Sequence, residues 1–237
     1  MAKVQKDQEY YDRIKEKFAS ERDLRLGYRP QGTDQYTSDF SGAKQKYGVD
    51  PYARSSNARE AINDSVEVLF IGGGFSALLT SARLREKGIE SIRIVERAGD
   101  VGGTWYWNRY PGVACDVISY DYLPLLDEMN YVPKRRYSGG EEILEHSRAI
   151  ARKYGLYDLA VFQTTVTSTV WNSDEKMWHV RTDRGDLMRA RFVVCANGTL
   201  SKPKLAKIEG IHEFSIDGGY GHEKGEFLGG QPPPHLL

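Results

Sequence analysis

The most constraining feature of this chain is an apolar, β-branched run at 66–71 that ends in three consecutive glycines. A continuous apolar run of this kind is typical of a buried parallel strand. The next segment, 75–87, is rich in helix formers and is followed by Gly88, which predicts a helix that ends there. A further segment at 91–96 predicts a second strand. Together these segments predict a strand–helix–strand unit with parallel strands and a right-handed crossover.

The glycines fit the pattern G-x-G-x-x-G/A of a dinucleotide site, with Gly72, Gly74 and Ala77 at its fixed positions. Gly72 would permit the tight turn out of the strand, and Gly74 would let the backbone approach a pyrophosphate. Ala77 would keep the helix close to the sheet. Glu96 ends the second strand, where a carboxylate can accept both ribose hydroxyls of an adenosine. An acid there favours FAD or NAD over NADP; the alternatives are a plain glycine-rich turn and a surface acid.

Charge and composition exclude several classes of function. The formal net charge is +0 with 28% charged residues, so no strong field favours nucleic acid or an anionic membrane. No apolar run is long enough for a transmembrane helix, and the N-terminus lacks the apolar core of a secretory signal. The cysteines Cys115 and Cys195 form no C-x-x-C pair, so we expect neither a disulfide framework nor a metal site, and we expect Cys195 to be a small buried hydrophobe. These features predict a cytoplasmic protein.

Changes in composition divide the chain into three parts. Residues 1–63 predict an N-terminal extension, with a charged helix at 4–26 followed by irregular chain rich in glycine and proline. This extension would wrap over a core, as a solubilising lead-in or as a gate for substrate. Residues 64–212 predict the dinucleotide-binding domain, and residues 213–237 predict a low-complexity, disordered tail.

The later half of the central part predicts one more helix and an antiparallel meander. Ser138 and Glu141 fit a capping box before a helix at 139–154, on whose exposed face His146 would be solvated. Alternating segments predict a meander over 161–195, with strands at 161–171, 177–182 and 189–195. The predicted class is α/β, a Rossmann-like βαβ domain that carries a three-stranded antiparallel β insertion.

A second segment with chemical meaning is Gly102-Gly103-Thr104-Trp105-Tyr106-Trp107-Asn108-Arg109-Tyr110-Pro111-Gly112. Its glycine pair would let the chain pass close to a ligand, and Thr104 can donate a hydrogen bond to a phosphate. Trp105, Tyr106 and Trp107 would offer flat apolar walls with polar edges, although three aromatic residues in a row can also be plain core. With Cys115-Asp116 and 195–204, this segment resembles the signature of the type I Baeyer–Villiger monooxygenases, an FAD-dependent family.

The resemblance implies a flavoprotein that takes hydride from NADPH onto FAD and inserts one oxygen atom beside a ketone, giving an ester or a lactone. It implies that Asp116 is the catalytic residue, which lies near the flavin and orients an arginine that stabilises the flavin peroxide anion. Together with the glycine motif, the predicted cofactor-binding residues are Gly72, Gly74, Ala77, Glu96, Thr104, Trp105, Tyr106, Trp107, Cys115, Asp116, Tyr122, Val166, Asn197 and Gly198. For Tyr122 the alternative is a half-buried structural tyrosine. The variant Leu123-Pro124-Leu125-Leu126 resembles members that act in secondary metabolism.

After position 212 the chain departs from the family pattern. Members run to well over twice this length and continue with a second glycine motif for NADPH, which has no counterpart here. The sequence therefore predicts a truncated gene product that lacks the NADPH-binding domain and is inactive or incomplete as this chain alone. The alternative is a non-catalytic flavin-binding remnant, or a half-domain that acts with a protein partner supplying the missing half.

Overall fold

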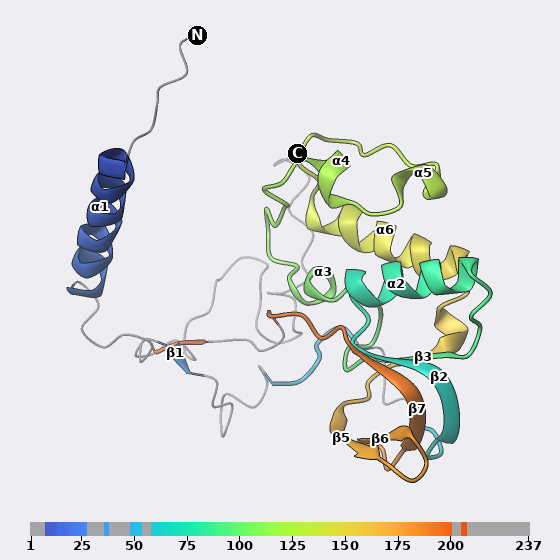
Figure 1. Cartoon of the computed structure of the whole chain (residues 1–237). Helices are drawn as coiled ribbons and strands as arrows, with labels where there is room; N and C mark the ends of the chain where they lie inside the picture. The colour runs from blue at the N-terminus through green and yellow to red at the C-terminus, as the bar shows by residue number, and fades with distance from the viewer. Residues whose placement is uncertain (1–7, 28–35, 38–47, 54–57, 201–204, 208–237) are drawn as a thin grey trace. The chain divides into compact units, whose positions relative to one another are not determined.

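The computed structural model describes residues 8–27, 36–37, 48–53, 58–200 and 205–207 (Figure 1). These residues fall into two compact units, one made of 8–27, 36–37 and 205–207 and the other made of 48–53 and 58–200. The predicted tail at 213–237 lies outside the described residues. The predicted division of the chain into three parts therefore stays a prediction.

The smaller unit consists of a helix and a short pair of strands. α1 (Gln8–Gly27) corresponds to the charged helix predicted at 4–26. None of its residues is buried, and Phe18, which belongs to its apolar stripe, is 66% exposed. β1 (Tyr36–Thr37) pairs antiparallel with β8 (Leu205–Ala206). No helix in the part of the chain that the structure describes is long and apolar enough to cross a lipid bilayer.

The larger unit is built on a six-stranded sheet with the order β4-β3-β2-β7-β6-β5 (Figure 1). Its strands are β2 (Asn63–Ile71), β3 (Ile92–Val95), β4 (Ala160–Val161), β5 (Val166–Asn172), β6 (Met177–Thr182) and β7 (Leu187–Cys195). β2, β3, β4 and β7 run parallel, whereas β6 is antiparallel to both of its neighbours. The parallel pair β2–β3, joined by α2 (Phe75–Glu86), confirms the predicted strand–helix–strand unit.

The predicted three-stranded antiparallel meander is present as β5, β6 and β7, and its last strand joins it to the parallel part of the same sheet. β7 pairs with β6 along one edge and with β2 along the other, in a register that runs from Asn63 opposite Leu187 to Ile71 opposite Cys195. The first predicted strand of the meander is broken into β4 and β5, where Gln163 turns the chain with a φ of 50°. Because β2, β3 and β7 run parallel, their carboxyl ends lie at one edge of the sheet.

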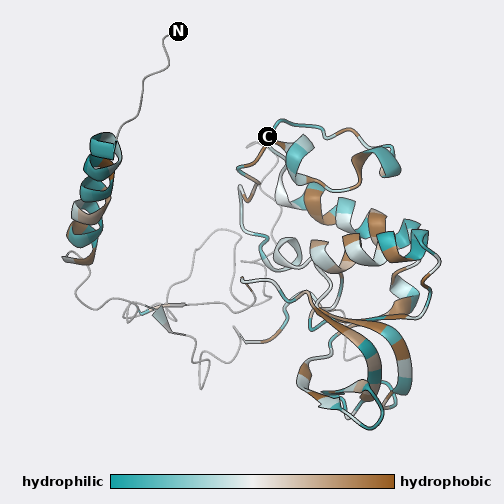
Figure 2. Ribbon diagram, viewed as in Figure 1, coloured by the Kyte–Doolittle hydropathy of each residue, from teal (hydrophilic) through white to brown (hydrophobic). Residues whose placement is uncertain are grey.

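Two long helices cover one face of the sheet. α2 packs beside α6 (Gly140–Lys153), and Figure 1 shows both on the same side of the strands. The core between helices and sheet includes Phe70, Leu78, Ile94 and Ile150. Because neighbouring residues of a strand point to opposite faces, Leu69 belongs to a second core on the other face. Figure 2 shows the hydrophobic residues of these helices and strands as alternating bands along each element.

The predicted capping box at the start of α6 is wrong. The N-cap residue is Gly139, which offers no side chain to the first turn of the helix. The Ser138 hydroxyl instead shares a hydrogen bond of 2.9 Å with the hydroxyl of Ser119, which begins α4 (Ser119–Tyr122). Ser138 therefore ties the chain before α6 to α4, a partner that local spacing does not reveal.

His146 is also not solvated as predicted, because it is only 4% exposed. Its Nε2 donates a hydrogen bond to the Pro124 carbonyl oxygen over 2.7 Å, and its ring lies 5.1 Å from the ring of Tyr131. The covering segment contains the short helix α5 (Leu126–Met129). The burial of His146 therefore depends on a connection between helices that carries no periodic signal.

Candidate dinucleotide-binding site

The first glycine turn joins the carboxyl end of β2 to the start of α2. Gly72 has a φ of 108°, and a Cβ there would lie 2.6 Å from the carbonyl oxygen of Ala196. Its N–H donates to the carbonyl of Val95 over 2.8 Å. Only glycine fits at position 72, because the backbone directly after β2 passes close to Ala196, which follows the end of β7. The turn leads into the N-terminus of α2, where helical N–H groups lack intrahelical partners.

The second glycine pair lies directly against the first turn. The N–H of Gly102 donates to the Gly73 carbonyl over 3.0 Å. A Cβ on Gly103, which has a φ of 54°, would lie 2.9 Å from the Cα of Gly74. A Cβ on Gly74 would meet the Gly103 Cα at 3.4 Å, which is an ordinary contact. Packing therefore requires glycine at position 103 but not at position 74, where the backbone lines the cavity described below.

Glu96 is buried and points its carboxylate at the first glycine turn. One oxygen accepts the N–H of Gly73 and the other accepts the N–H of Ala98 over 2.6 Å. Burial raises the pKa of Glu96, and the N–H groups of Ala98 and Gly73 oppose this shift. A carboxylate has about four lone-pair positions, so both oxygens retain capacity to accept hydroxyl groups.

The aromatic segment forms α3 (Thr104–Trp107), whose residues point in two directions. The Trp105 indole N–H donates to the Tyr122 hydroxyl over 2.8 Å, and the two rings meet edge to face with centroids 5.7 Å apart. Burial raises the pKa of Tyr122, and the bond from Trp105 opposes this shift. Tyr106 faces away and is 2% exposed, and its hydroxyl donates to Asp50 over 2.9 Å. Tyr106 therefore belongs to the core, whereas Trp105 and Tyr122 form one wall.

A cavity of about 580 Å³ opens where these pieces meet, at the carboxyl edge of the parallel strands. A volume in this range suits a cofactor or substrate site. The predicted cofactor-binding residues that line it are Gly72, Gly74, Glu96, Thr104, Trp105, Trp107, Tyr122, Val166, Asn197 and Gly198. The structure thus brings together residues from six separate parts of the chain.

Four predicted residues do not line the cavity. Ala77 is fully buried between α2 and the sheet, in agreement with its predicted role in close packing. Tyr106 and Cys115 are buried in the core around α3. Asp116 is exposed, and its charge raises the pKa of Tyr122 together with larger contributions from burial. The prediction that Cys195 is a small buried hydrophobe is wrong. Cys195 is exposed at the end of β7 and lines the cavity.

Sequence reasoning missed several lining residues next to the predicted ones. Arg97 follows Glu96, and its guanidinium lies 4.6 Å from the centre of the Trp107 ring. Thr164 and Thr165 precede β5 and also line the cavity, and the Thr164 N–H donates a hydrogen bond to the Glu96 carbonyl over 3.0 Å. All three lie just beyond the carboxyl ends of β3 and β4, which is where open α/β sheets bind ligands. That rule is the signal that could have found them.

Comparisons with known proteins agree with this geometry. A family model described as an NAD(P)-binding Rossmann-like domain matches residues 71–124. Neopentalenolactone D synthase of Streptomyces avermitilis is 49% identical over 202 residues, which cover 85% of this chain and 33% of the synthase. A Baeyer–Villiger monooxygenase of Streptomyces coelicolor is 46% identical over 204 residues, with the same two coverages of 85% and 33%. The chain therefore spans about one third of the length of these relatives.

Solved structures that are similar to this chain also belong to longer proteins. The polycyclic ketone monooxygenase from Thermothelomyces thermophila is 33% identical with a TM-score of 0.68, covering 77% of this chain and 32% of that one. Both comparisons cover more than three quarters of this chain and about one third of a longer protein.

Proposed function

We propose that this chain, a homologue of the Baeyer–Villiger monooxygenases over the third of their length that it spans, binds FAD in the cavity at the carboxyl edge of its sheet. The adenosine half would lie between the first glycine turn and Glu96, and the flavin half would lie beside Trp105 and Tyr122. One observation carries the proposal: a glycine turn, a helix N-terminus and a buried carboxylate meet at a single cavity.

The residues present fit FAD in three respects. The backbone at Gly74 faces the cavity without a Cβ, which leaves space for a pyrophosphate in front of the α2 N-terminus. Each oxygen of Glu96 holds one backbone N–H and can still accept a ribose hydroxyl. Trp105 and Tyr122 are locked together by a hydrogen bond and present a preformed apolar wall.

FAD, when bound, supplies the redox chemistry that amino-acid side chains cannot provide. The chain's own residues bind it, orient it and keep water from one side of it. Glu96 would hold the ribose, and the Trp105–Tyr122 pair would exclude water from the flavin half. For Asp116 we keep, as a prediction, the catalytic role that the family resemblance implies; its side chain is exposed and does not line the cavity.

The activity of the whole protein follows as a second part of the proposal. We infer an oxidation of a ketone to an ester or a lactone that consumes NADPH and oxygen. The support is the ketone in the name of the Thermothelomyces neighbour and the NADP⁺ bound to a cyclohexanone monooxygenase from Rhodococcus sp. Phi1, which is 32% identical with a TM-score of 0.59 over 65% of this chain and 29% of that one. A role in secondary metabolism, a cytoplasmic location and a protein partner remain predictions.

The test begins with the absorbance spectrum of the purified chain and continues with NADPH oxidation, with and without cyclohexanone. Bound FAD with ketone-dependent NADPH turnover would support both parts of the proposal. Bound FAD without turnover would support the cofactor site. It would favour the alternative that this chain is a flavin-binding remnant or half-domain that does not catalyse the reaction alone. Absence of bound FAD, together with no binding on titration with FAD, would overturn the cofactor site.

A further inference from the structure

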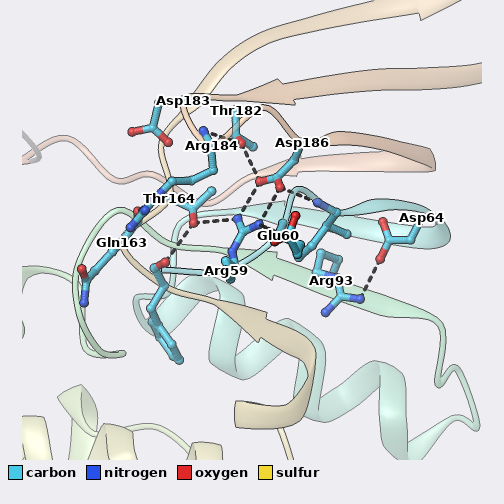
Figure 3. Close-up of polar contacts among 12 residues, drawn as sticks. Arg59, Glu60, Asp64, Arg93, Gln163, Thr164, Thr182, Asp183, Arg184 and Asp186 are labelled. Carbon is cyan, nitrogen blue, oxygen red and sulfur yellow. Dashed lines mark hydrogen bonds and ion pairs between the residues drawn. The ribbon is translucent and has the colours of Figure 1, made fainter. Parts of the chain in front are cut away.

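A partly buried ion pair between Arg59 and Asp186 lies beside Thr164, one of the residues that line the cavity (Figure 3). The Arg59 guanidinium donates two hydrogen bonds to the Asp186 carboxylate, each over 2.6 Å. Asp186 is 1% exposed and also accepts the Ile62 N–H over 2.8 Å and the Thr182 hydroxyl over 2.5 Å. Four donors thus converge on one carboxylate, which makes Asp186 the fixed centre of the turn between β6 and β7.

Arg59 and the turn between β6 and β7 together hold the segment 163–165 by three separate hydrogen bonds. Arg59 donates from its second Nη to the Thr164 hydroxyl over 3.1 Å. The Thr165 N–H donates to the Asp183 carboxylate over 2.8 Å. The Arg184 Nε donates to the carbonyl of residue 163 over 3.0 Å. Figure 3 labels Arg59, Thr164, Asp183 and Arg184 close together, and the contact between Arg59 and Thr164 joins residues 105 positions apart.

The held segment is also the wall next to Glu96. The Thr164 N–H donates to the Glu96 carbonyl over 3.0 Å, and the Gln163 N–H donates to the Ala98 carbonyl over 2.9 Å. Gln163 has a φ of 50°, a conformation that a residue with a side chain keeps only where its surroundings enforce it. Thr164, Thr165 and Val166 all line the cavity. The ion pair therefore contacts this wall at the Thr164 hydroxyl, beside the backbone bonds that join the wall to Glu96 and Ala98.

We propose that Asp186 is a positioning residue for the dinucleotide site: through Arg59 it holds the wall at 164–166 against the adenosine end of the ligand. This inference rests on the proposed function, because the end of β3 marked by Glu96 is where a dinucleotide places its adenosine ribose. Asp186 itself does not line the cavity. Its effect on ligand binding therefore has to pass through Arg59 and the turn.

The test uses the full chain and ADP as the probe, because ADP contains only the half of FAD that this wall would face. Isothermal titration gives the ADP dissociation constant of the unchanged chain, of Asp186→Asn and of Thr164→Val, on protein shown by circular dichroism to be folded. Thr164→Val leaves the ion pair intact and removes its contact with the wall. The matched control is Asp64→Asn, which breaks the Arg93–Asp64 pair of 2.7 Å in the same unit, also visible in Figure 3.

We expect Asp186→Asn to weaken ADP binding roughly tenfold and Thr164→Val to weaken it roughly threefold, with Asp64→Asn unchanged within about twofold. Equal ADP affinity in Asp186→Asn and the unchanged chain would overturn the inference while leaving the cofactor site in place. If Asp186→Asn does not fold, unchanged affinity in Thr164→Val has the same meaning. A fall in affinity that Asp64→Asn reproduces in full would show a merely structural role and would also overturn it. If the unchanged chain binds neither ADP nor FAD, the proposed function fails, and this inference fails with it.

Discussion

The Glu96 carboxylate accepts the N–H of Gly73, so the acid at the end of β3 and the glycine turn at the end of β2 form one fixed pair. A second bond, from the Ala98 N–H, immobilises the other oxygen. The carboxylate is therefore oriented before any ligand arrives, and a ligand need not spend binding free energy on ordering it. This arrangement is the structural reason for assigning the adenosine end of the ligand to this side of the cavity.

The first prediction concerns Gly74. Gly74→Ala should fold normally, because its Cβ would meet only backbone atoms of Gly103, the nearest being the Cα at an ordinary 3.4 Å. It should nevertheless weaken FAD binding at least roughly tenfold, since the Cβ occupies space that a pyrophosphate needs. Flavin fluorescence titration measures the affinity, and thermal unfolding checks the fold. Gly139→Ala is the control, with only the Val113 carbonyl oxygen near its Cβ, at 3.9 Å; equal FAD affinities in the two variants would refute the assignment.

The second prediction separates Gly72 from an ordinary turn glycine. Both Gly72 and Gly88 have a positive φ, so alanine at either position costs about 1–3 kcal/mol of backbone strain. Only at Gly72 would the new Cβ also collide with the Ala196 carbonyl, whereas Gly88 has open space. Urea unfolding should therefore give a lower free energy of unfolding for Gly72→Ala than for Gly88→Ala. A smaller loss at Gly72 would mean that the β2–β7 approach is not tight.

The third prediction is a coupling between Trp105 and Tyr122. Trp105→Phe and Tyr122→Phe each remove one end of the same hydrogen bond. Each variant should weaken FAD binding a few-fold, and the double variant should lose less than the sum of the two free-energy changes, because contacting residues couple by about 0.5–3 kcal/mol. Titration of all four proteins with FAD completes the cycle. Strict additivity would show that the bond does not support the wall.

The fourth prediction is a loss of stability in mild acid that originates at His146. Burial lowers the pKa of His146, and its bond to the Pro124 carbonyl opposes this shift. The unfolded chain takes up its proton near pH 6.5, whereas the folded chain does so only at lower pH. The contribution of neutral His146 to the free energy of unfolding is therefore fully present above about pH 6.5. It is lost as the pH falls below this value, by at most about 1.4 kcal/mol per pH unit.

His146→Gln is the matching variant, because its amide can still donate to the Pro124 carbonyl and does not titrate. Urea unfolding between pH 8 and pH 5, an interval chosen to bracket the pKa of histidine at about 6.5, should show a steeper loss for the unchanged chain than for this variant. Parallel curves for the two proteins would rule out His146 as the source.

The sequence predicted those parts of the site that local spacing encodes. The strand–glycine–helix pattern placed Gly72 and Gly74 correctly, and the end of the second strand placed Glu96, because each signal lies within one βαβ unit. Trp105 and Trp107 were also placed at the cavity, although their neighbour Tyr106 turned into the core. A short helix sends successive side chains in different directions, so a run of aromatic residues cannot all face one ligand.

What the sequence could not predict depends on contacts between distant segments. The pairing of β2 with β7 merges the meander with the parallel sheet, and no local pattern distinguishes this from a separate insertion. The bond between Arg59 and Asp186 joins residues 127 positions apart. His146 is buried because the chain around Pro124 covers it. In each case the partner is chosen by tertiary packing, which overrides the local preference.

The central claim is that one cavity binds FAD through a preformed adenosine site. Its most direct test is equilibrium titration of the purified chain with FAD, followed by displacement with ADP. We expect saturable binding of one FAD per chain, displaced competitively by ADP and weakened at least roughly tenfold in Gly74→Ala. Failure to bind FAD, or FAD binding that neither ADP nor Gly74→Ala affects, would contradict it.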